Sequence, residues 1–248
     1  MRILVALLAA CLASVAFWAS LDHPITTPDW TGEIRGLAYS PSGLYSESDK
    51  DNKVTDELIR RDLAQLSKIT NRVRTYTVAF NYDRIPYVAK EFGMKVSLGL
   101  WLGRDRNLNE REIALAIKTI AANPGTIDRV FVGNETVGVR AELTGREVSG
   151  YIKRVKAAID NPAVQVGTAE VWPTWLTETE LADGADFVAI HLLPYWEGVS
   201  YDKSMEYITS SFDQIAKLYP GKTIVIGETG WPSDGRAKKN SVPSPAVE

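Results

Sequence analysis

The chain has 248 residues, of which 45% are hydrophobic and 24% charged, so one large folded domain or two small ones are expected rather than a disordered chain. The net charge is −3 and the sequence has no block of basic residues, which argues against nucleic acid as a partner. Cys11 is the one cysteine and allows no intrachain disulfide, and two histidines are too few for a His-based zinc site. We therefore expect no metal and no other cofactor.

The chain begins with an apolar segment. Residues 3–21 carry no charge and come close to the ~20 residues that a helix needs to cross a bilayer. Residues 1–21 therefore predict a signal peptide or membrane anchor, which we favour over a lipobox at Leu8-Ala9-Ala10-Cys11 and over a buried helix. Arg2 would keep the short end cytoplasmic and export the rest, giving a periplasmic or extracellular protein. Residues 22–31 predict a linker, and residues 32–248 the folded domain.

From there, β-branched apolar runs alternate with segments of helical periodicity. The expected strands are 34–40, 72–78, 95–102, 127–135, 164–172, 187–196 and 223–231. Between them, Val148, Ile152 and Val155 form one helical stripe, and Thr144 with Glu147 forms a capping box. This alternation predicts an α/β fold of the (β/α)8 TIM-barrel type with seven βα units present. A doubly wound sheet fits less well, because no glycine-rich phosphate loop follows the first strand.

Two of the expected strands end in a glutamate. One segment reads Val130-Phe131-Val132-Gly133-Asn134-Glu135, and the other runs from Thr223 through Gly227-Glu228-Thr229-Gly230-Trp231-Pro232-Ser233. Barrels place their chemistry at the carboxyl ends of their strands, so Glu135 and Glu228 are expected to share one site. A pair of carboxylates is what glycoside hydrolysis requires.

These two motifs resemble the signature elements of glycoside hydrolase family 17, which comprises β-1,3-glucanases and β-1,3-glucanosyltransferases. The resemblance implies a retaining mechanism with Glu135 as acid/base and Glu228 as nucleophile, and it implies that Asn134 binds the sugar 2-hydroxyl. The segment His191–Glu197 resembles bacterial members more than plant ones. Some bacterial members are exported domains of membrane glucan synthases, which makes such a synthase a candidate partner beside β-glucan and the membrane.

Further site residues follow from their places at strand ends. Arg74 and Tyr76 share one face of the second strand and are expected to orient Glu228, unless Arg74 forms an internal ion pair. Glu170 is expected at the mouth, bonding sugar or supporting the acid/base, with a plain salt bridge as the alternative. His191 is expected to contact the nucleophile or substrate, or else to be a core histidine. The expected sugar-stacking rings are Tyr195 and Trp231, followed by Trp101, Trp172 and Trp196, with core packing as the alternative for each.

The segment after the second motif is short. Only 15 residues follow Ser233, whereas an eighth βα unit needs ~30 residues, so the domain is expected to be incomplete at its C-terminal side. The sequence leaves hydrolysis and transglycosylation open, because acceptor binding decides between water and a sugar hydroxyl. The competing functional class is a non-catalytic glucan-binding or scaffold domain beside a membrane synthase.

Overall fold

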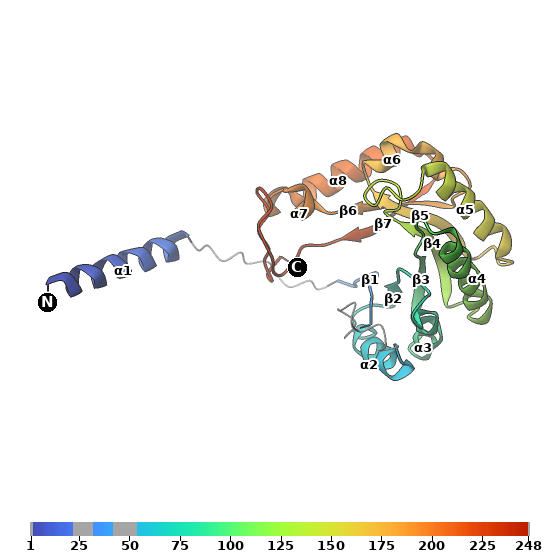
Figure 1. Ribbon diagram of the computed structural model, residues 1–248, viewed down its shortest axis with the longest axis horizontal. Coiled ribbons are helices and arrows are strands. Elements are labelled where there is room, and N and C mark those ends of the chain that lie inside the picture. Colours follow the sequence, from blue (N-terminus) through green and yellow to red (C-terminus); the bar gives the residue numbers. More distant parts are fainter. Residues whose placement is uncertain (1, 22–31, 42–53, 248) are drawn as a thin grey trace.

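Seven parallel strands form one curved sheet in the computed structural model, which describes residues 2–21, 32–41 and 54–247 (Figure 1). Neighbours along the chain are neighbours in the sheet, in the order β1 to β7. The strands are β1 (Leu37–Ala38), β2 (Arg72–Arg74), β3 (Lys95–Leu100), β4 (Ile127–Asn134), β5 (Gln165–Val171), β6 (Phe187–Leu192) and β7 (Thr223–Thr229). This succession of parallel neighbours is that of an incomplete (β/α)8 barrel, as the sequence predicts.

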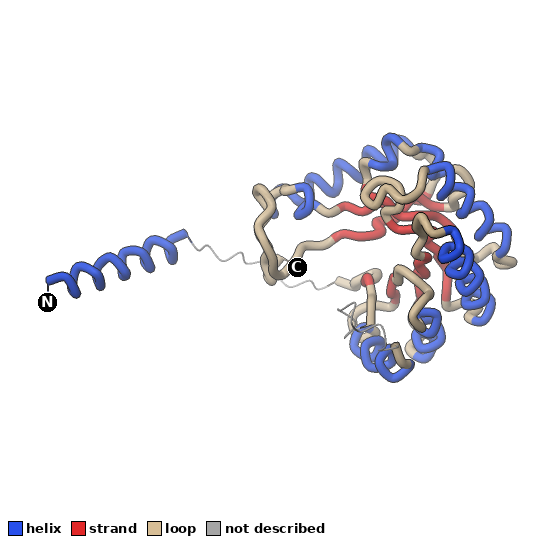
Figure 2. The backbone as a smooth tube through the Cα atoms, in the orientation of Figure 1, coloured by secondary structure: helices blue, strands red, loops and turns tan. Residues whose placement is uncertain are grey.

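Helices cover the convex face of the sheet (Figure 2). They are α2 (Asp56–Leu66), the 3₁₀ turn η2 (Tyr82–Arg84), α3 (Ile85–Glu91), α4 (Arg106–Ala122), α5 (Gly145–Ala158), α6 (Thr174–Thr177), the 3₁₀ turn η3 (Thr179–Ala182), α7 (Pro194–Glu197) and α8 (Tyr201–Leu218). Side chains fix where several of them begin. At α5 both bonds of the predicted capping box form, with Thr144 accepting from the Glu147 N–H and Glu147 accepting from the Thr144 N–H.

The side chains of the sheet divide into two layers because successive residues of a strand point to opposite faces. The larger layer packs between sheet and helices and includes Leu98, Val130 and Ile190, all fully buried. The smaller layer lines the concave face. Its members are Phe131, Ala169, Phe187, Ala189 and the partly buried Val225. Side chains near the carboxyl ends on this concave side can therefore converge on one site.

The two outer strands of the sheet are exposed. The described residues contain no eighth strand, and β1 and β7 pair on one side only. Every residue of β6 is buried, whereas Ile226 of β7 is 42% exposed. A cavity of about 760 Å³ opens between the two edges and reaches inward to Arg74 and Gly227. The nucleophile expected on β7 therefore sits on a strand that is held from one side among the described residues.

Every strand is shorter in the structure than expected, and three of them are shorter by four residues or more. The first reduces to Leu37–Ala38, and the second ends at Arg74. The sixth was expected to reach residue 196 but ends at Leu192, because Pro194 begins α7. Proline has no N–H to donate to a ladder, while its fixed φ suits the first turn of a helix.

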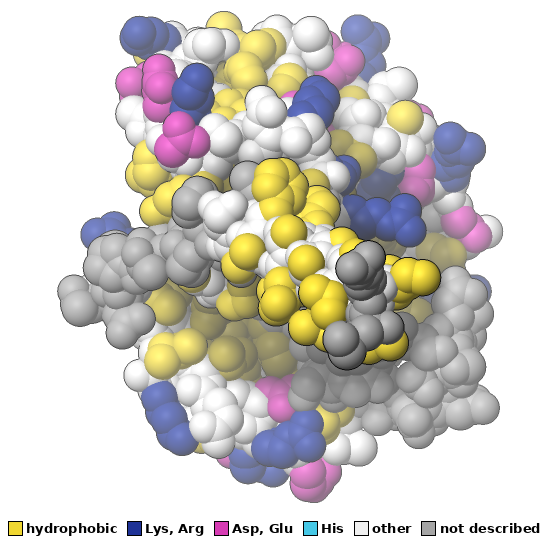
Figure 3. Space-filling model, turned by 90° about the vertical axis from the view of Figure 1, so that its left-hand side faces the viewer, with side chains coloured by type: hydrophobic (Ala, Val, Ile, Leu, Met, Phe, Trp, Pro, Cys, Tyr) yellow, Lys and Arg dark blue, Asp and Glu magenta, His cyan; other side chains and the backbone are white. Residues whose placement is uncertain are grey.

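The apolar N-terminal segment forms the helix α1 (Arg2–Leu21). Its Ile3–Ser20 stretch has a mean hydropathy of 2.3 and is long enough to cross a membrane. Large side chains along it are exposed, for example Leu7 at 61% and Trp18 at 67%. Figure 3 shows the hydrophobic side chains of α1 gathered at the centre of the view. The linker expected over residues 22–31 lies outside the described residues.

Candidate active site

A shift in strand register turns Glu228 toward the concave side. Ile190 pairs with Ile226, but the next residue of β6, His191, pairs with Glu228, so Gly227 is an extra residue in β7. Strict alternation would send residue 228 to the same face as Ile226. The bulge reverses this and brings Glu228 beside His191. A Cβ at position 227 would lie 3.0 Å from the His191 ring, so glycine also suits the close approach.

A second register shift precedes Glu135. Phe131 pairs with Gly167 and Asn134 pairs with Ala169, so three steps along β4 match two steps along β5. Gly133 has φ +90° and Glu135 has φ +50°, a left-handed conformation that a residue with a side chain rarely adopts. The Glu135 N–H donates to the Ala169 carbonyl at 2.8 Å. Both glutamates therefore follow a glycine-containing irregularity at the carboxyl end of a strand.

Two donors from the second strand region hold Glu228. Arg74 Nη1 lies 3.0 Å from Glu228 Oε1, and Tyr76 Oη donates to the same oxygen at 2.9 Å. Burial and the nearby Glu228 carboxylate raise the pKa of Tyr76, so its hydroxyl stays a proton donor. The Glu228 side chain is 23% exposed. The positions expected for Arg74 and Tyr76 from strand alternation are thus those that the structure shows.

Arg74 links three elements of the site. Its guanidinium also donates to the Gly227 carbonyl at 2.8 Å and to Asn134 Oδ1 at 2.6 Å. Burial lowers the pKa of Arg74, while Glu228 acts in the opposite direction. Because Arg74 occupies the carbonyl oxygen of Asn134, the amide nitrogen of Asn134 is left to donate to a ligand.

His191 connects the two glutamates. Its Nε2 lies 3.1 Å from Arg74 Nη1, and its Nδ1 lies 2.6 Å from Glu135 Oε1. A guanidinium can only donate, so the tautomer that suits this contact has Nε2 as acceptor and the ring proton on Nδ1. In that tautomer His191 donates to Glu135. Because this bond uses Oε1, the second carboxyl oxygen of Glu135 remains available to carry a proton.

The two carboxylates lie close together. One oxygen each of Glu135 and Glu228 and one ring nitrogen of His191 lie within 4.8 Å of one another. Retaining glycosidases hold their carboxyl groups ~5–5.5 Å apart, whereas inverting enzymes need ~6.5–9.5 Å to admit a water. The same three groups could in principle hold a metal ion, but Arg74 already places a positive charge against two of them.

Glu170 does not face the mouth of the site as we expected. It lies on the helix-facing side of β5, opposite to Ala169, and is fully buried. Its two oxygens accept from the backbone N–H groups of Val137 at 2.9 Å and Gly138 at 3.1 Å. Burial raises the pKa of Glu170 to about 7, although these N–H bonds act to lower it. In this arrangement Glu170 cannot contact a sugar directly. Its hydrogen bonds instead support the backbone segment that follows Glu135.

Two of the five expected sugar-stacking rings are exposed and three are not. Tyr195 and Trp231 are buried and pack edge to face at 5.7 Å, with Trp231 donating to the Val242 carbonyl, so neither offers an open ring. Trp172 is partly buried and donates to Tyr207 at 2.6 Å. Exposed rings belong instead to Trp101, at 45%, and Trp196, at 60%. A cation lies over each exposed ring, Arg140 at 4.0 Å and Lys238 at 3.9 Å.

Sequence reasoning missed a second buried carboxylate at this end of the sheet. Glu112 of α4 accepts from the Thr77 hydroxyl at 2.6 Å and from the N–H groups of Val78 and Trp101 at 2.9 and 3.0 Å. It ties the segments after β2 and β3 together. The available signal was a glutamate on the buried stripe of an amphipathic helix, directly before Ile113.

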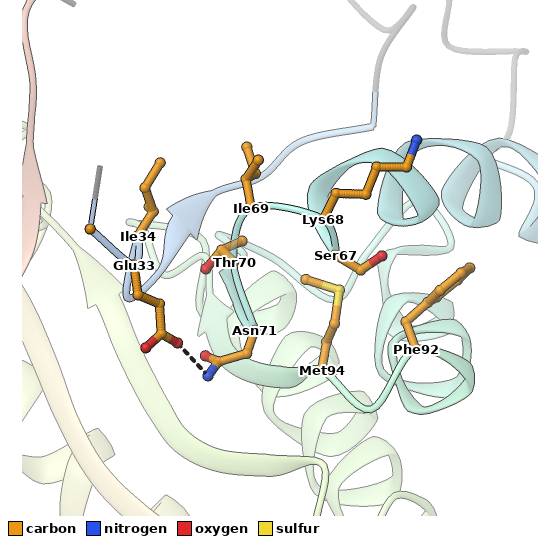
Figure 4. A pocket seen from close by; sticks show the side chains of 10 residues that line it. Glu33, Ile34, Ser67, Lys68, Ile69, Thr70, Asn71, Phe92 and Met94 are labelled. Atoms are coloured by element: carbon orange, nitrogen blue, oxygen red, sulfur yellow. Dashed lines mark hydrogen bonds between the residues drawn. The ribbon is translucent and has the colours of Figure 1, made fainter. Parts of the chain in front are cut away.

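A second hollow, of about 520 Å³, lies at the opposite end of the sheet (Figure 4). It is bounded by the ends of α2 and α3 and by Glu33 and Ile34, and Asn71 donates to Glu33 across it at 2.9 Å. Because parallel α/β folds place their chemistry at the carboxyl ends of the strands, the candidate site is the Glu135–Glu228 pair.

A family comparison agrees with this geometry. The profile described as the BtgE/BtgC glycoside hydrolase domain matches residues 36–248. The chain belongs to this family. The match spans every strand of the sheet and includes both glutamates, so the site is part of the family domain.

Individual relatives of the family domain are fungal. The glucan endo-1,3-beta-glucosidase btgC of Emericella nidulans is 28% identical over 219 residues, which are 81% of this chain and 33% of that protein. The glucan 1,3-beta-glucosidase of Arthroderma benhamiae is 26% identical over 221 residues, covering 80% of this chain and 70% of that protein. The chain thus spans a third of the btgC protein.

A solved structure extends the comparison to the fold. The glycoside hydrolase family 17 beta-1,3-glucanosyltransferase from Rhizomucor miehei superimposes with a TM-score of 0.75 at 28% identity, covering 85% of this chain and 76% of that one. An active-site mutant of that enzyme has been solved in complex with laminaritriose. The resemblance to family 17 that the motifs indicated is confirmed.

Proposed function

We propose that this chain is a retaining glycoside hydrolase or transglycosylase that acts on β-1,3-linked glucan. The observation that carries the proposal is the pair of carboxylates, Glu135 and Glu228, whose oxygens lie within 4.8 Å of each other in different surroundings. Glu228 Oε1 accepts from the positively charged Arg74, whereas Glu135 Oε1 lies against Nδ1 of His191. The fungal glucosidases and the R. miehei glucanosyltransferase support the choice of β-1,3-glucan as substrate.

In the first step, a Glu228 oxygen attacks the anomeric carbon while the bond to the leaving oxygen breaks. Glu135 donates its proton to that oxygen, so the leaving sugar departs as a neutral alcohol. Arg74 and Tyr76 both bind Oε1 of Glu228 and so present the other oxygen for attack. In this mechanism the amide nitrogen of Asn134, whose carbonyl oxygen Arg74 binds, donates to the sugar 2-hydroxyl, the role that the motif predicts.

In the second step, Glu135 removes a proton from the incoming water or sugar hydroxyl, and that oxygen displaces Glu228 from the anomeric carbon. Water gives hydrolysis and a sugar hydroxyl gives transfer. Two inversions at one carbon leave the product with the anomeric configuration of the substrate.

Trapping the intermediate tests the proposal. A 2-fluoro laminaribiosyl fluoride should label the chain once, and peptide mass spectrometry should place the label on Glu228. Glu228→Gln should abolish both labelling and turnover of laminari-oligosaccharides. Glu91→Gln is the matched control, because Glu91 pairs with Arg60 on the surface. Absence of labelling and turnover in the wild-type chain, or labelling elsewhere, would contradict the proposal. Products longer than the substrate would indicate transfer, and only shorter ones hydrolysis.

A glucan-binding or scaffold domain remains the competing class, and the exposed rings of Trp101 and Trp196 would suit it. Binding alone does not require two carboxylates held within 4.8 Å, so the site favours the enzyme. Under the binding alternative, Glu228→Gln and the wild-type chain would retain laminari-oligosaccharides equally and neither would release product.

For the location we propose that residues 1–21 form a signal peptide or membrane anchor that exports the domain of residues 32–248. The exposed, apolar α1 supports this. A membrane glucan synthase as partner, and a bacterial type of domain, are parts of the same proposal and rest on the sequence motifs; the relatives compared above are fungal. Fractionation of cells that express the full chain should place the domain outside the cytoplasm, and recovery from the cytoplasm would contradict the proposal.

A further inference from the structure

The backbone segment that follows Glu135 is hydrogen-bonded to the buried carboxylate of Glu170. Residues 136–138 turn away from β4, and the N–H groups of Val137 and Gly138 both point at Glu170 on the neighbouring strand. Each oxygen of Glu170 accepts one of them, so the carboxylate acts as a two-pronged clamp on the backbone. Glu170 is fully buried beneath this turn and is shielded from ligand.

The clamped turn carries a strained residue. Glu135 has φ +50°, a strained conformation that a non-glycine residue keeps only where its surroundings enforce it. Several bonds do so. The Thr136 hydroxyl accepts from the Asn134 N–H at 3.1 Å, and the Arg140 N–H donates to the Glu135 carbonyl at 2.9 Å. The bonds to Glu170 are the ones in this set in which one buried side chain holds two successive N–H groups.

We propose that Glu170 is a positioning residue for the acid/base: by clamping the N–H groups of Val137 and Gly138 it keeps Glu135 in its left-handed conformation, facing His191. The inference rests on the proposed function, in which Glu135 moves the proton. Glu170 itself touches no substrate. A shift of about 1 Å in a catalytic group costs roughly 10²-fold in rate. Loss of the bonds to Glu170 should therefore slow proton transfer by Glu135 more than it weakens substrate binding.

Glu170→Gln breaks the clamp with little change in shape, because glutamine offers one acceptor oxygen and turns donors toward the second N–H. Glu112→Gln is the matched control. Glu112 is also a buried carboxylate that accepts two backbone N–H bonds at the same end of the sheet, but those bonds come from Val78 and Trp101. Glu170→Asp, whose shorter side chain reaches less far, is a second variant should Glu170→Gln fail to fold.

Two substrates distinguish a defect in proton transfer from a general loss of activity. Unactivated laminari-oligosaccharides need the acid, whereas a 2,4-dinitrophenyl laminaribioside with azide as acceptor needs neither acid nor base. With rates normalised to the fraction that a 2-fluoro fluoride labels, Glu170→Gln should lose about 10²-fold on the first substrate and less than about threefold on the second. Glu112→Gln should lose the same factor on both. Equal losses on both substrates for Glu170→Gln would overturn the inference.

Amide hydrogen exchange provides a readout that does not depend on activity. Residues 136–138 should exchange faster in Glu170→Gln than in the wild type, and at the wild-type rate in Glu112→Gln. Unchanged exchange there would overturn the clamp. If the wild-type chain neither turns over nor labels, the proposed function fails, and the exchange rates alone then decide whether Glu170 holds the turn.

Discussion

Removing one oxygen atom from Tyr76 gives a sharp test of how Glu228 is held. In Tyr76→Phe the ring can stay where it is, while the 2.9 Å bond to Glu228 Oε1 is lost and the 3.0 Å contact of Arg74 with the same oxygen remains. A hydrogen bond to a charged group is worth about 1.5–3 kcal/mol. Glu228 is 23% exposed, so water can partly replace the hydroxyl, and we expect a loss near the lower end. About 1.5 kcal/mol corresponds to a rate roughly tenfold lower.

The assay is kcat/KM on laminaripentaose together with urea unfolding. Tyr207→Phe is the control, because Tyr207 on α8 also makes a side-chain hydrogen bond, but with Trp172 rather than with Glu135 or Glu228. Both variants should unfold at similar urea concentrations, and only Tyr76→Phe should lose activity. A loss below about twofold for Tyr76→Phe, or an equal loss in the control, would refute the view that the hydroxyl orients the nucleophile.

Three further changes have expected outcomes. Burial raises the pKa of Glu170 from 4.5 to about 7, so between these pH values the folded chain keeps a proton that the unfolded chain has lost. The contribution of Glu170 to stability is therefore full below pH 4.5 and is lost as the pH rises to about 7. Urea unfolding from pH 4 to 8 should show a fall of roughly 3 kcal/mol from this group, absent in Glu170→Gln. Arg74→Lys keeps the charge but loses the bond to Asn134, and kcat/KM should fall about 10²-fold while the chain stays folded; near-normal kinetics would count against the proposed role. Gly99→Ala would place a Cβ 2.2 Å from the Thr75 carbonyl oxygen, and calorimetry should show a loss of about 3 kcal/mol, whereas an unchanged melting temperature would contradict the tight packing of β2 on β3.

The order of strands could be predicted because each βα unit has its own apolar periodicity. The lengths of the strands could not. β1 is two residues long although its run of suitable residues is longer, because pairing requires a neighbour in register as well as suitable residues. β6 ends before Pro194 although aromatic and apolar residues continue, because local proline chemistry outweighs the hydrophobic pattern.

The site was predictable to the level of motif and strand end, but its side-chain directions were not. Alternation placed Arg74 and Tyr76 on one face, and both contact Glu228 although β2 itself ends at Arg74. Its place near a strand end put Glu170 at the mouth, which is wrong, because neither its burial nor its backbone partners can be seen in a string of residues. Glu228 shows the converse case. Its direction depends on the extra residue in β7, and a bulge is visible only when the partner strand is known.

The two register shifts explain how one sheet can hold Glu135 and Glu228 at different positions and in different surroundings. A parallel sheet without bulges would place side chains of adjacent strands in rows at fixed spacing, all on one of two faces. The extra residue at Gly227 brings Glu228 into the same layer as His191, and the register shift around Gly133 leaves Glu135, directly after β4, in a left-handed conformation. His191 then lies between them, bound to Glu135 at Nδ1 and to the arginine that holds Glu228 at Nε2. Hydrogen-bonding contacts of His191 and Arg74 therefore join the two glutamates, and in the proposed mechanism they would position the nucleophile and the acid/base together.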